Sequence, residues 1–436
     1  LKRSQVKKLT KSGIKTMQDL AETALSDISG INTETFERLK MQARIQKSSV
    51  GKDIPDYEVL IPKDTRNLGL TLLPPSSKLD VYFDIEGFPL EDDGLEYLWG
   101  NTYFDEHGDR QFKDFWAHTH EEEKQAFKDF IEWVYSRWRT DPSMHIYHYA
   151  NYEIAACRKL MSKYGICEYE VDQLLRNDVF VDLYKIVTNG LIIGEPKYSI
   201  KNVEHLYREK RDTEVGTGAD SVVVYDHWRE NPDGDTWETS KILKNIRDYN
   251  IDDCDSTQEL VTWLRERQKE NNIQYLGKTD IVEPEIPEEV SNITSLRDKL
   301  LTEADCDRKT NTQLASLKEN LAWMLEFHRR EAKLVFWKLF DRLGQADNEL
   351  LDDMECLALC VRTQRDAFKP TKRSRNLAYE YSFDASQEFK GIKANSFYVI
   401  GWRDENDKEK KVTYLSDQSD LADGLIVVQC NEEPPE

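Results

Sequence analysis

The clearest hydrophobic pattern in the chain lies between Leu79 and Pro89. Val81, Phe83 and Ile85 alternate with more polar residues, and this period of two is typical of a β-strand with two different faces. A glycine and a proline follow, and both residue types favour the end of a strand. The pattern therefore predicts one strand over these eleven residues.

The same reasoning predicts a mixed α/β block after this strand. We expect, in order, strands at Glu96–Phe104 and Gln111–His118, a helix at Glu121–Trp138, a strand at Met144–His148, a helix over 151–163, a strand at Val179–Asp182, a helix capped by Ser199, and a long helix at Ser240–Gln268. Residues 212–236 contain Gly and Pro breaks, so we expect them to be irregular or short-helical. This order predicts a mixed β-sheet flanked by helices.

Changes in pattern divide the rest of the chain. Residues 1–47 are expected to form short helices joined by Gly-Ile turns, which resemble a helix-hairpin-helix; a plain helical lead-in is the alternative. The other predicted regions are a linker at 48–78 with one strand at Tyr57–Ile61, the α/β domain at 79–270, a linker at 271–293, a helical region at 294–367 with helices at Leu296–Leu343 and Glu349–Arg365, and a small antiparallel β domain at 368–436.

Composition narrows the class of protein. Of the 436 residues, 39% are hydrophobic and 33% charged, and no apolar run approaches the roughly 20 residues that span a bilayer. The seven cysteines include no CxxC pair, so we expect reduced packing residues rather than disulfides or a zinc site. These features predict a cytoplasmic protein with no membrane contact. The chain opens on Leu1 rather than Met, so we expect an excerpt or a processed form.

The net charge of −22 disfavours broad binding of phosphates, because a polyanion is repelled at long range. Basic residues nevertheless gather in two places, where they are either solvated faces or local contacts to nucleic acid. The candidates for such contacts are Lys7, Lys8, Lys11 and Lys15 near the start, and Lys372 and Arg373 near the end.

Candidate chemistry begins with Asp84 and Glu86, which are two residues apart and therefore share one face of the first strand. Crowding two carboxylates costs Coulomb energy unless a cation lies between them, and Mg²⁺ or Mn²⁺ is the usual occupant of all-oxygen sites. The alternative is a solvated strand end in an acidic protein. Further acids at the same place would favour the metal site.

Three more residues are candidates for that place. Glu153 is expected in the first turn of a helix that follows a strand end, although the helix dipole alone would favour an acid there. Tyr249 and Asp253 are four residues apart and share one face of the long helix, and aspartate in mid-helix is a poor helix former. The alternative for this pair is the wet face of an acidic helix.

In this order the residues resemble the DEDDy branch of the DnaQ-like exonucleases. The segments FDIEGFP, LEYLWG, YHYANYE, FVDLYKIV, YSIKNVEHLY and YNIDDCDST, over about residues 80–260, resemble the YprB-like RNase H-like domain of the RecB-like nuclease family. GIKTMQDLA, LKMQARIQ, FHRREAK and LFDRL outside that core are also similar to this family. The element order agrees with an RNase H-like mixed sheet.

The resemblance implies hydrolysis of phosphodiester bonds with two Mg²⁺ or Mn²⁺ ions. By carry-over, Asp84 would bridge the ions, Glu86 and Asp253 would be ligands, Glu153 would complete one ion's shell, and Tyr249 would orient and help deprotonate the attacking water. The wider family has Asp where Glu153 stands, and the resemblance implies that the longer Glu153 completes this shell directly or through water. Lys201 is a candidate phosphate contact or a solvated lysine, and His148 is expected to be a strand residue rather than a ligand.

The expected activity is therefore a metal-dependent 3′–5′ exonuclease on single-stranded nucleic acid, DNA rather than RNA. The family context implies a helicase domain on the same longer polypeptide, acting in DNA repair or defence. Gly277-Lys278-Thr279 is not a P-loop, because Asn272 stands where its first glycine should be and no apolar strand precedes it, so we expect no NTPase motor within these residues. The alternatives are an inactive nucleic-acid-binding scaffold and an RNase of the same fold.

Overall fold

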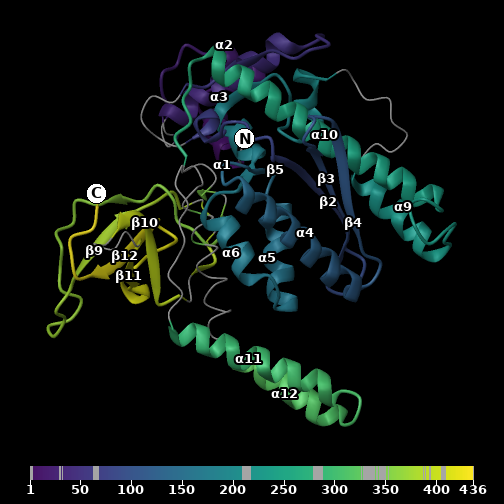
Figure 1. Ribbon diagram of the computed structural model, residues 1–436. Coiled ribbons are helices and arrows are strands. Elements are labelled where there is room, and N and C mark those ends of the chain that lie inside the picture. Colours follow the sequence, from purple (N-terminus) through teal and green to yellow (C-terminus); the bar gives the residue numbers. More distant parts are fainter. Residues whose placement is uncertain are drawn as a thin grey trace. The chain divides into compact units, whose positions relative to one another are not determined.

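The fold is described here from a computed structural model of the chain (Figure 1). The structure describes residues 3–28, 31, 33–61, 68–208, 218–277, 288–325, 327, 339, 342, 350–351, 353–385, 387, 389–391, 394–403 and 409–435. The chain divides into two compact units. The larger comprises Ser12–Asp27 and Asn32–Pro284, and the smaller comprises Leu1–Lys11, Ile28–Ile31 and Glu285–Glu436.

The larger unit is built on a five-stranded mixed sheet with the strand order β4-β3-β2-β5-β6. Its strands are β2 (Val81–Phe88), β3 (Leu95–Phe104), β4 (Arg110–Trp116), β5 (Ile146–His148) and β6 (Phe180–Asp182). β2 pairs antiparallel with β3 and parallel with β5, so the first strand of the domain is also its central strand. A central strand is covered on both of its faces, and this covering buries most residues of β2.

Helices cover both faces of this sheet (Figure 1). On one side lie α4 (His120–Thr140), α5 (Tyr152–Tyr164) and α6 (Glu168–Arg176), and on the other lie α9 (Gly218–Glu230) and the 30-residue helix α10 (Lys241–Glu270). The connections contain α7 (Leu183–Gly190), α8 (Ile200–Val203) and the short turns η1 (Gly69–Leu72) and η2 (Glu204–Leu206).

Odd-numbered residues of β2 face α4. The ring of Phe83 stacks on Phe130 of α4 and on Trp99 of β3, with centroids 4.4 and 5.8 Å apart. Aromatic contacts of this kind add to the free energy gained by burying the rings themselves. They fix the orientation of the central strand against the helix layer.

Even-numbered residues of β2 face α10. Tyr82 stacks on Tyr147 of β5 and belongs to an apolar cluster that includes Leu260 and Leu264 of α10. Because side chains alternate along a strand, the next two even positions, which are acidic, also point toward α10. The polar side of the strand is therefore held under a helix rather than exposed to water.

A buried ion pair fastens the C-terminal half of α10 to the start of β2. Arg265 donates to the Asp80 carboxylate at 3.2 Å and to the Tyr147 hydroxyl at 2.7 Å. Asp80 is almost fully buried and also accepts backbone N–H bonds from Ser77 and His145. Burial raises the pKa of Asp80, which Arg265 and these donors oppose. The pair therefore sets the height of the helix over the sheet.

A two-stranded sheet and two helices extend the larger unit. β1 (Tyr57–Val59) pairs antiparallel with β7 (Leu191–Ile193), and α3 (Thr33–Ser49) packs beside α2 (Met17–Glu22) and β7. Thr16 caps α2 through a capping box with Asp19. Gly69 has φ +60° and lies against Gly190: a Cβ at position 69 would be only 2.7 Å from the Gly190 Cα, so no larger residue fits there.

The smaller unit contains an antiparallel sheet and a helical hairpin. Its elements are α1 (Arg3–Lys11), α11 (Glu288–Asp307), α12 (Thr312–Leu325), β8 (Val361–Arg362), β9 (Leu377–Ser382), β10 (Ser396–Arg403), β11 (Glu409–Tyr414), η4 (Ser416–Gln418) and β12 (Leu425–Cys430). The strand order is β10-β11-β12-β9-β8, and all of its pairings are antiparallel. α11 and α12 pack against each other.

The predicted fold class is confirmed: a helix-flanked mixed sheet is accompanied by a C-terminal antiparallel sheet. The strands expected from period-two patterns and the helices at 121–138, 151–163 and 240–268 are present. The proposed domain boundaries stay predictions, as does the helix-hairpin-helix, whose second turn at Gly30 lies outside the described residues. The P-loop-like lysine and threonine, at 278 and 279, also lie outside them.

Two helix predictions need correction. The segment Glu349–Arg365 is not one helix over its described part: Leu350 is helical, but residues 353–360 are irregular with a turn at 354–355, and Val361–Arg362 pairs with β9 as β8. Leu357 and Cys360 pack on the core of the antiparallel sheet, and this tertiary contact outweighs a local helical pattern. Conversely, residues 212–236 contain the 13-residue helix α9, which the Gly and Pro breaks on either side had obscured.

None of the helices in the described part of the chain combines the length and the apolar character needed to cross a membrane.

The Arg265–Asp80 contact predicts a large effect on stability. Arg265→Met should lower the free energy of unfolding by about 3 kcal/mol, because it leaves the buried Asp80 carboxylate without its cation. Arg176→Met removes another Arg–Asp pair, but Arg176 is 43% exposed, so it should cost less than about 1 kcal/mol. Urea unfolding followed by tryptophan fluorescence measures both. Equal losses in the two variants would contradict the assigned role.

Candidate metal centre

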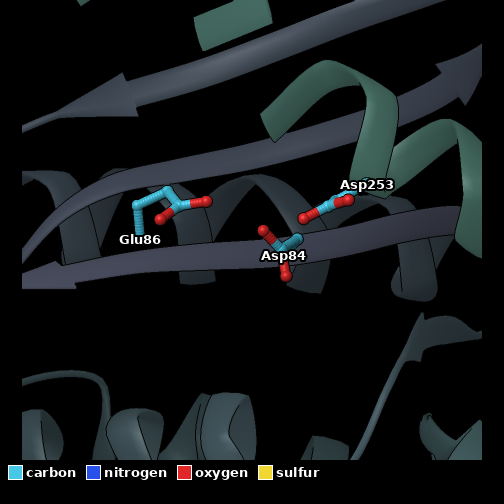
Figure 2. A group of neighbouring side chains, drawn as sticks. All are labelled: Asp84, Glu86 and Asp253. Atoms are coloured by element: carbon cyan, nitrogen blue, oxygen red, sulfur yellow. The ribbon is translucent and has the colours of Figure 1, made fainter. Parts of the chain in front are cut away.

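Three carboxylates from two distant segments meet between the sheet and α10. β2 supplies Asp84 and Glu86, and α10 supplies Asp253; one oxygen atom from each lies within 4.8 Å of the others. Figure 2 shows the three side chains pointing toward one another from the strand and the helix. The convergence expected from the sequence is therefore present for these three acids.

Burial and mutual repulsion make this group electrostatically unfavourable by itself. Glu86 is 6% exposed and Asp253 is 9% exposed, whereas Asp84 is half-buried. Burial raises the pKa of Asp84 well above its usual range, and the charges of Asp253, Glu86 and Glu153 raise it further. Burial also raises the pKa of Glu86 to about 8, against the opposing hydrogen bond from Ser221. Each carboxylate thus disfavours the ionised form of its neighbours.

Each of the three acids has one donor from a different element. The Asn250 amide Nδ2 donates to Asp84 Oδ2 at 2.7 Å, and the Ser221 hydroxyl of α9 donates to Glu86 Oε2 at 2.8 Å. The Lys201 ammonium of α8 donates to Asp253 Oδ1 at 2.7 Å. These bonds hold the carboxylates in place, and only one of the three donors carries a positive charge.

Glu153 lies in the first turn of α5 and is 4% exposed, but it falls outside the three-acid group. Its Oε2 is 3.4 Å from Nδ1 of His148, which is fully buried on β5. Burial alone would lower the pKa of His148, but the carboxylates of Glu153 and Asp182 raise it. Burial raises the pKa of Glu153, against the opposing contact with His148. His148 is thus a strand residue, as expected, whose ring partners the fourth acid.

Tyr249 precedes Asp253 by one turn of α10 and is 8% exposed. Burial raises the pKa of its phenol, and the charges of Asp253, Glu86 and Asp84 raise it further. The Lys201 ammonium lies 4.7 Å from the centre of the Tyr249 ring. The tyrosine is therefore a protonated hydrogen-bond donor at the edge of the acidic group.

The donor set suits a hard divalent cation. All three grouped ligands are carboxylate oxygens, which Mg²⁺ and Mn²⁺ prefer, and histidine and cysteine are absent from the group itself. Burial is the main cause of the raised pKa values of Asp84 and Glu86, and repulsion by Asp253 adds to both. A divalent cation would remove this repulsion, so the residues fit the metal that the sequence predicted.

Of the predicted phosphate contacts, Lys201 lies at this site, where it pairs with Asp253. Lys7, Lys11 and Lys15 are exposed near the N-terminus, and Lys8 pairs with Asp384 at 2.7 Å. Lys372 and Arg373 are exposed in the turn that precedes β9. Their role stays a prediction.

Sequence reasoning missed Ser221 and Asn250. Ser221 lies in the segment expected to be irregular, so the sequence contained no signal for its contact with Glu86. Asn250 did carry a signal, because asparagine is a poor helix former and this one lies inside a continuous 30-residue helix.

Comparison with known proteins agrees with this architecture. A family model described as the RNase H superfamily matches residues 81–265, which include the central sheet, α10 as far as Arg265, and the acids Asp84, Glu86, Glu153 and Asp253. A search of curated proteins and a search of solved structures found no match. The chain thus contains an RNase H-like domain whose acidic cluster is compatible with a nuclease.

The crowding of the acids predicts a pH dependence of stability. Because the pKa of Glu86 is raised to about 8, the folded chain still holds this proton at pH values where the unfolded chain has already lost it. The free energy of unfolding contributed by this group therefore falls as the pH rises from about 5 to 8. With a chelator present, Glu86→Gln should lose less stability over this range than the unmodified chain.

Urea unfolding at pH 5, 6.5 and 8 measures this difference. Glu91→Gln is the matched control, because the hydrogen bond from Arg229 lowers the pKa of Glu91 and places its titration below the range. An identical pH dependence in the Glu86→Gln variant and the unmodified chain would refute the electrostatic account.

Proposed function

We propose that this chain is a divalent-metal-dependent nuclease that hydrolyses phosphodiester bonds of single-stranded nucleic acid. The observation that carries the proposal is the meeting of Asp84, Glu86 and Asp253 in one buried group on an RNase H-like domain. Bound Mg²⁺ or Mn²⁺, two ions in the mechanism we favour, would supply the positive charge that activates water and stabilises the oxygens of the scissile phosphate.

The protein's own groups would divide the remaining work. Asp84, Glu86 and Asp253 would hold the cations. Glu153, whose Oε2 lies 3.4 Å from Nδ1 of His148, would add negative charge from behind these ligands. Tyr249 would orient the attacking water through its hydroxyl, because its raised pKa keeps the phenol protonated. Lys201, whose ammonium reaches Asp253, would face an approaching phosphate once cations take over that carboxylate.

A cavity supports attack at the end of a strand. It encloses about 230 Å³ at the end of β2, where Phe88, Glu96, Tyr152 and Lys159 contribute to its wall. Tyr152 immediately precedes Glu153, and Phe88 follows Glu86 by two residues. A terminal nucleotide bound there would favour an exonuclease, and the 3′–5′ polarity of the DEDDy type is proposed from the family resemblance.

The wider setting is part of the same proposal. We place the domain beside a helicase on a longer cytoplasmic polypeptide that acts on DNA in repair or defence. The exposed lysines near the N-terminus, together with Lys372 and Arg373, would contact the phosphate backbone of the strand. Their positive charge would offset the repulsion expected from a chain of net charge −22.

One observation favours a different function. Lys201 already pairs with Asp253, so the acidic group is partly neutralised without any metal. A scaffold that binds nucleic acid without cutting it would need no more than this. Activity with a divalent cation therefore has to be measured directly.

The proposed activity predicts metal-dependent degradation of a labelled strand. With Mn²⁺, the protein should shorten single-stranded DNA progressively from the 3′ end, and Asp84→Asn should lower the rate by at least about 100-fold, because it removes one charged ligand from the centre. Gel analysis of 3′- and 5′-labelled DNA and RNA strands gives the rate, the polarity and the preferred sugar.

Asp105→Asn, in the exposed turn between β3 and β4, is the matched control and should retain full activity. Equal rates for Asp84→Asn and the unmodified chain would show that the acids are misassigned. Binding of DNA without degradation under any divalent cation would instead support the scaffold.

The position of Tyr249 predicts a separation of binding from chemistry. Tyr249→Phe should lower the rate of hydrolysis about 10- to 100-fold, since it removes the hydroxyl that orients water, while the affinity for Mn²⁺ stays unchanged. Single-turnover kinetics and calorimetric titration with Mn²⁺ measure the two effects. A weaker affinity for Mn²⁺ would mean that the hydroxyl supports the carboxylates rather than the water.

A further inference from the structure

Asn250 is a fully buried polar residue on the face of α10 that covers the acidic group. Its relative exposure is 0%, and it lies directly after Tyr249 and three residues before Asp253. Asparagine disfavours the interior of a helix, and burying its amide costs free energy unless hydrogen bonds replace those with water. A residue with both costs at this place calls for a compensating contact.

That contact is made with Asp84. The Asn250 Nδ2 donates to Asp84 Oδ2 at 2.7 Å, which leaves Oδ1 of the same carboxylate free of this bond. An amide donor carries no net charge, so it orients the carboxylate without neutralising it. Lys201, in contrast, brings a full positive charge to Asp253. Asn250 thus holds Asp84 in place without supplying the positive charge that a cation would bring.

Gly100 provides the space for this side chain. It is paired directly opposite Asp84 in the β2–β3 register, so the two positions share a face of the sheet. A Cβ atom at position 100 would lie 1.6 Å from Asn250 Oδ1 and 2.7 Å from its Cγ. Any other residue at position 100 would therefore displace the amide from the sheet and from Asp84.

We propose that Asn250 is a positioning residue for the metal ligand Asp84, and that Gly100 is glycine in order to admit it. The inference rests on the proposed function, since it assigns Asp84 to a cation. Residues that orient metal ligands typically contribute about 10- to 100-fold to metal affinity or activity. Asn250 would act in this way through a single hydrogen bond.

Calorimetric titration of the whole chain with Mn²⁺ tests this role without relying on activity. Asn250→Ala and Asn250→Leu should each weaken the affinity for Mn²⁺ about tenfold, the leucine variant while preserving most of the side-chain volume. Gly100→Ala should weaken it to a similar degree by displacing the amide. In the double variant Gly100→Ala/Asn250→Ala the second change should add nothing, because both act on the same contact.

Asn101→Ala is the matched control. Asn101 is also fully buried on β3, but its amide donates to the backbone carbonyls of Trp99 and Lys113 rather than to a carboxylate. This variant should lower the melting temperature while leaving the affinity for Mn²⁺ unchanged. Should Asn250→Ala fail to fold, Asn250→Leu and Gly100→Ala still decide the question.

The outcomes separate the two proposals. If the unmodified chain binds no Mn²⁺, the proposed function fails, and the role of Asn250 fails with it. If the unmodified chain binds Mn²⁺ and the variants at positions 250 and 100 bind it equally well, only the positioning role is overturned. Additive losses in the double variant would overturn the assignment of Gly100.

Discussion

The structure depends on holding several carboxylates of like charge together in one partly buried site. Taking an acid out of water is unfavourable, and placing a second acid beside it is more so. The central strand β2 nevertheless presents Asp84 and Glu86 to α10, which adds Asp253. The surrounding fold has to supply enough packing and enough hydrogen bonds to hold this arrangement.

That support comes from both layers of the domain. On the far side of β2, aromatic rings lock the strand onto α4, as the 4.4 Å stacking of Phe83 on Phe130 shows. On the near side, the bond of Arg265 to the Asp80 carboxylate anchors the C-terminal half of α10, away from the acids. The apolar contacts of Leu260 and Leu264 lie between these points. The acids therefore sit on two rigid elements, whose separation is fixed by contacts that contain no acid of the group.

Much of this was readable from the sequence, because the relevant patterns are local. Alternation predicted β2, and the four-residue spacing of Tyr249 and Asp253 predicted their shared helix face. Local patterns do not fix which helix covers which face of a sheet, so the convergence of α10 on β2 was expected only through the family resemblance. The contact of Ser221 with Glu86 depends on the position of α9, which follows from packing alone.

The failed helix prediction has the same origin. Glu349–Arg365 has helical spacing, yet its described part is mostly irregular and contains the strand β8, since pairing with β9 and burial of Cys360 decide its conformation. A strand that follows later in the chain thus outweighed the local helical preference. Glu153 stays a predicted member of the site: it lies outside the three-acid group, and its Oε2 is 3.4 Å from Nδ1 of His148.

The charges around the acidic group show why Lys201 alone does not neutralise it. Four acids are present, and the described cationic partners are Lys201 on Asp253 and, when protonated, His148 on Glu153. Asn250 and Ser221 orient Asp84 and Glu86 without adding charge. The two acids that β2 contributes thus accept hydrogen bonds from uncharged donors, and burial, with repulsion by Asp253, raises the pKa of both. A divalent cation at that place would relieve their repulsion and give an acidic protein a local positive charge with which to hold a phosphate.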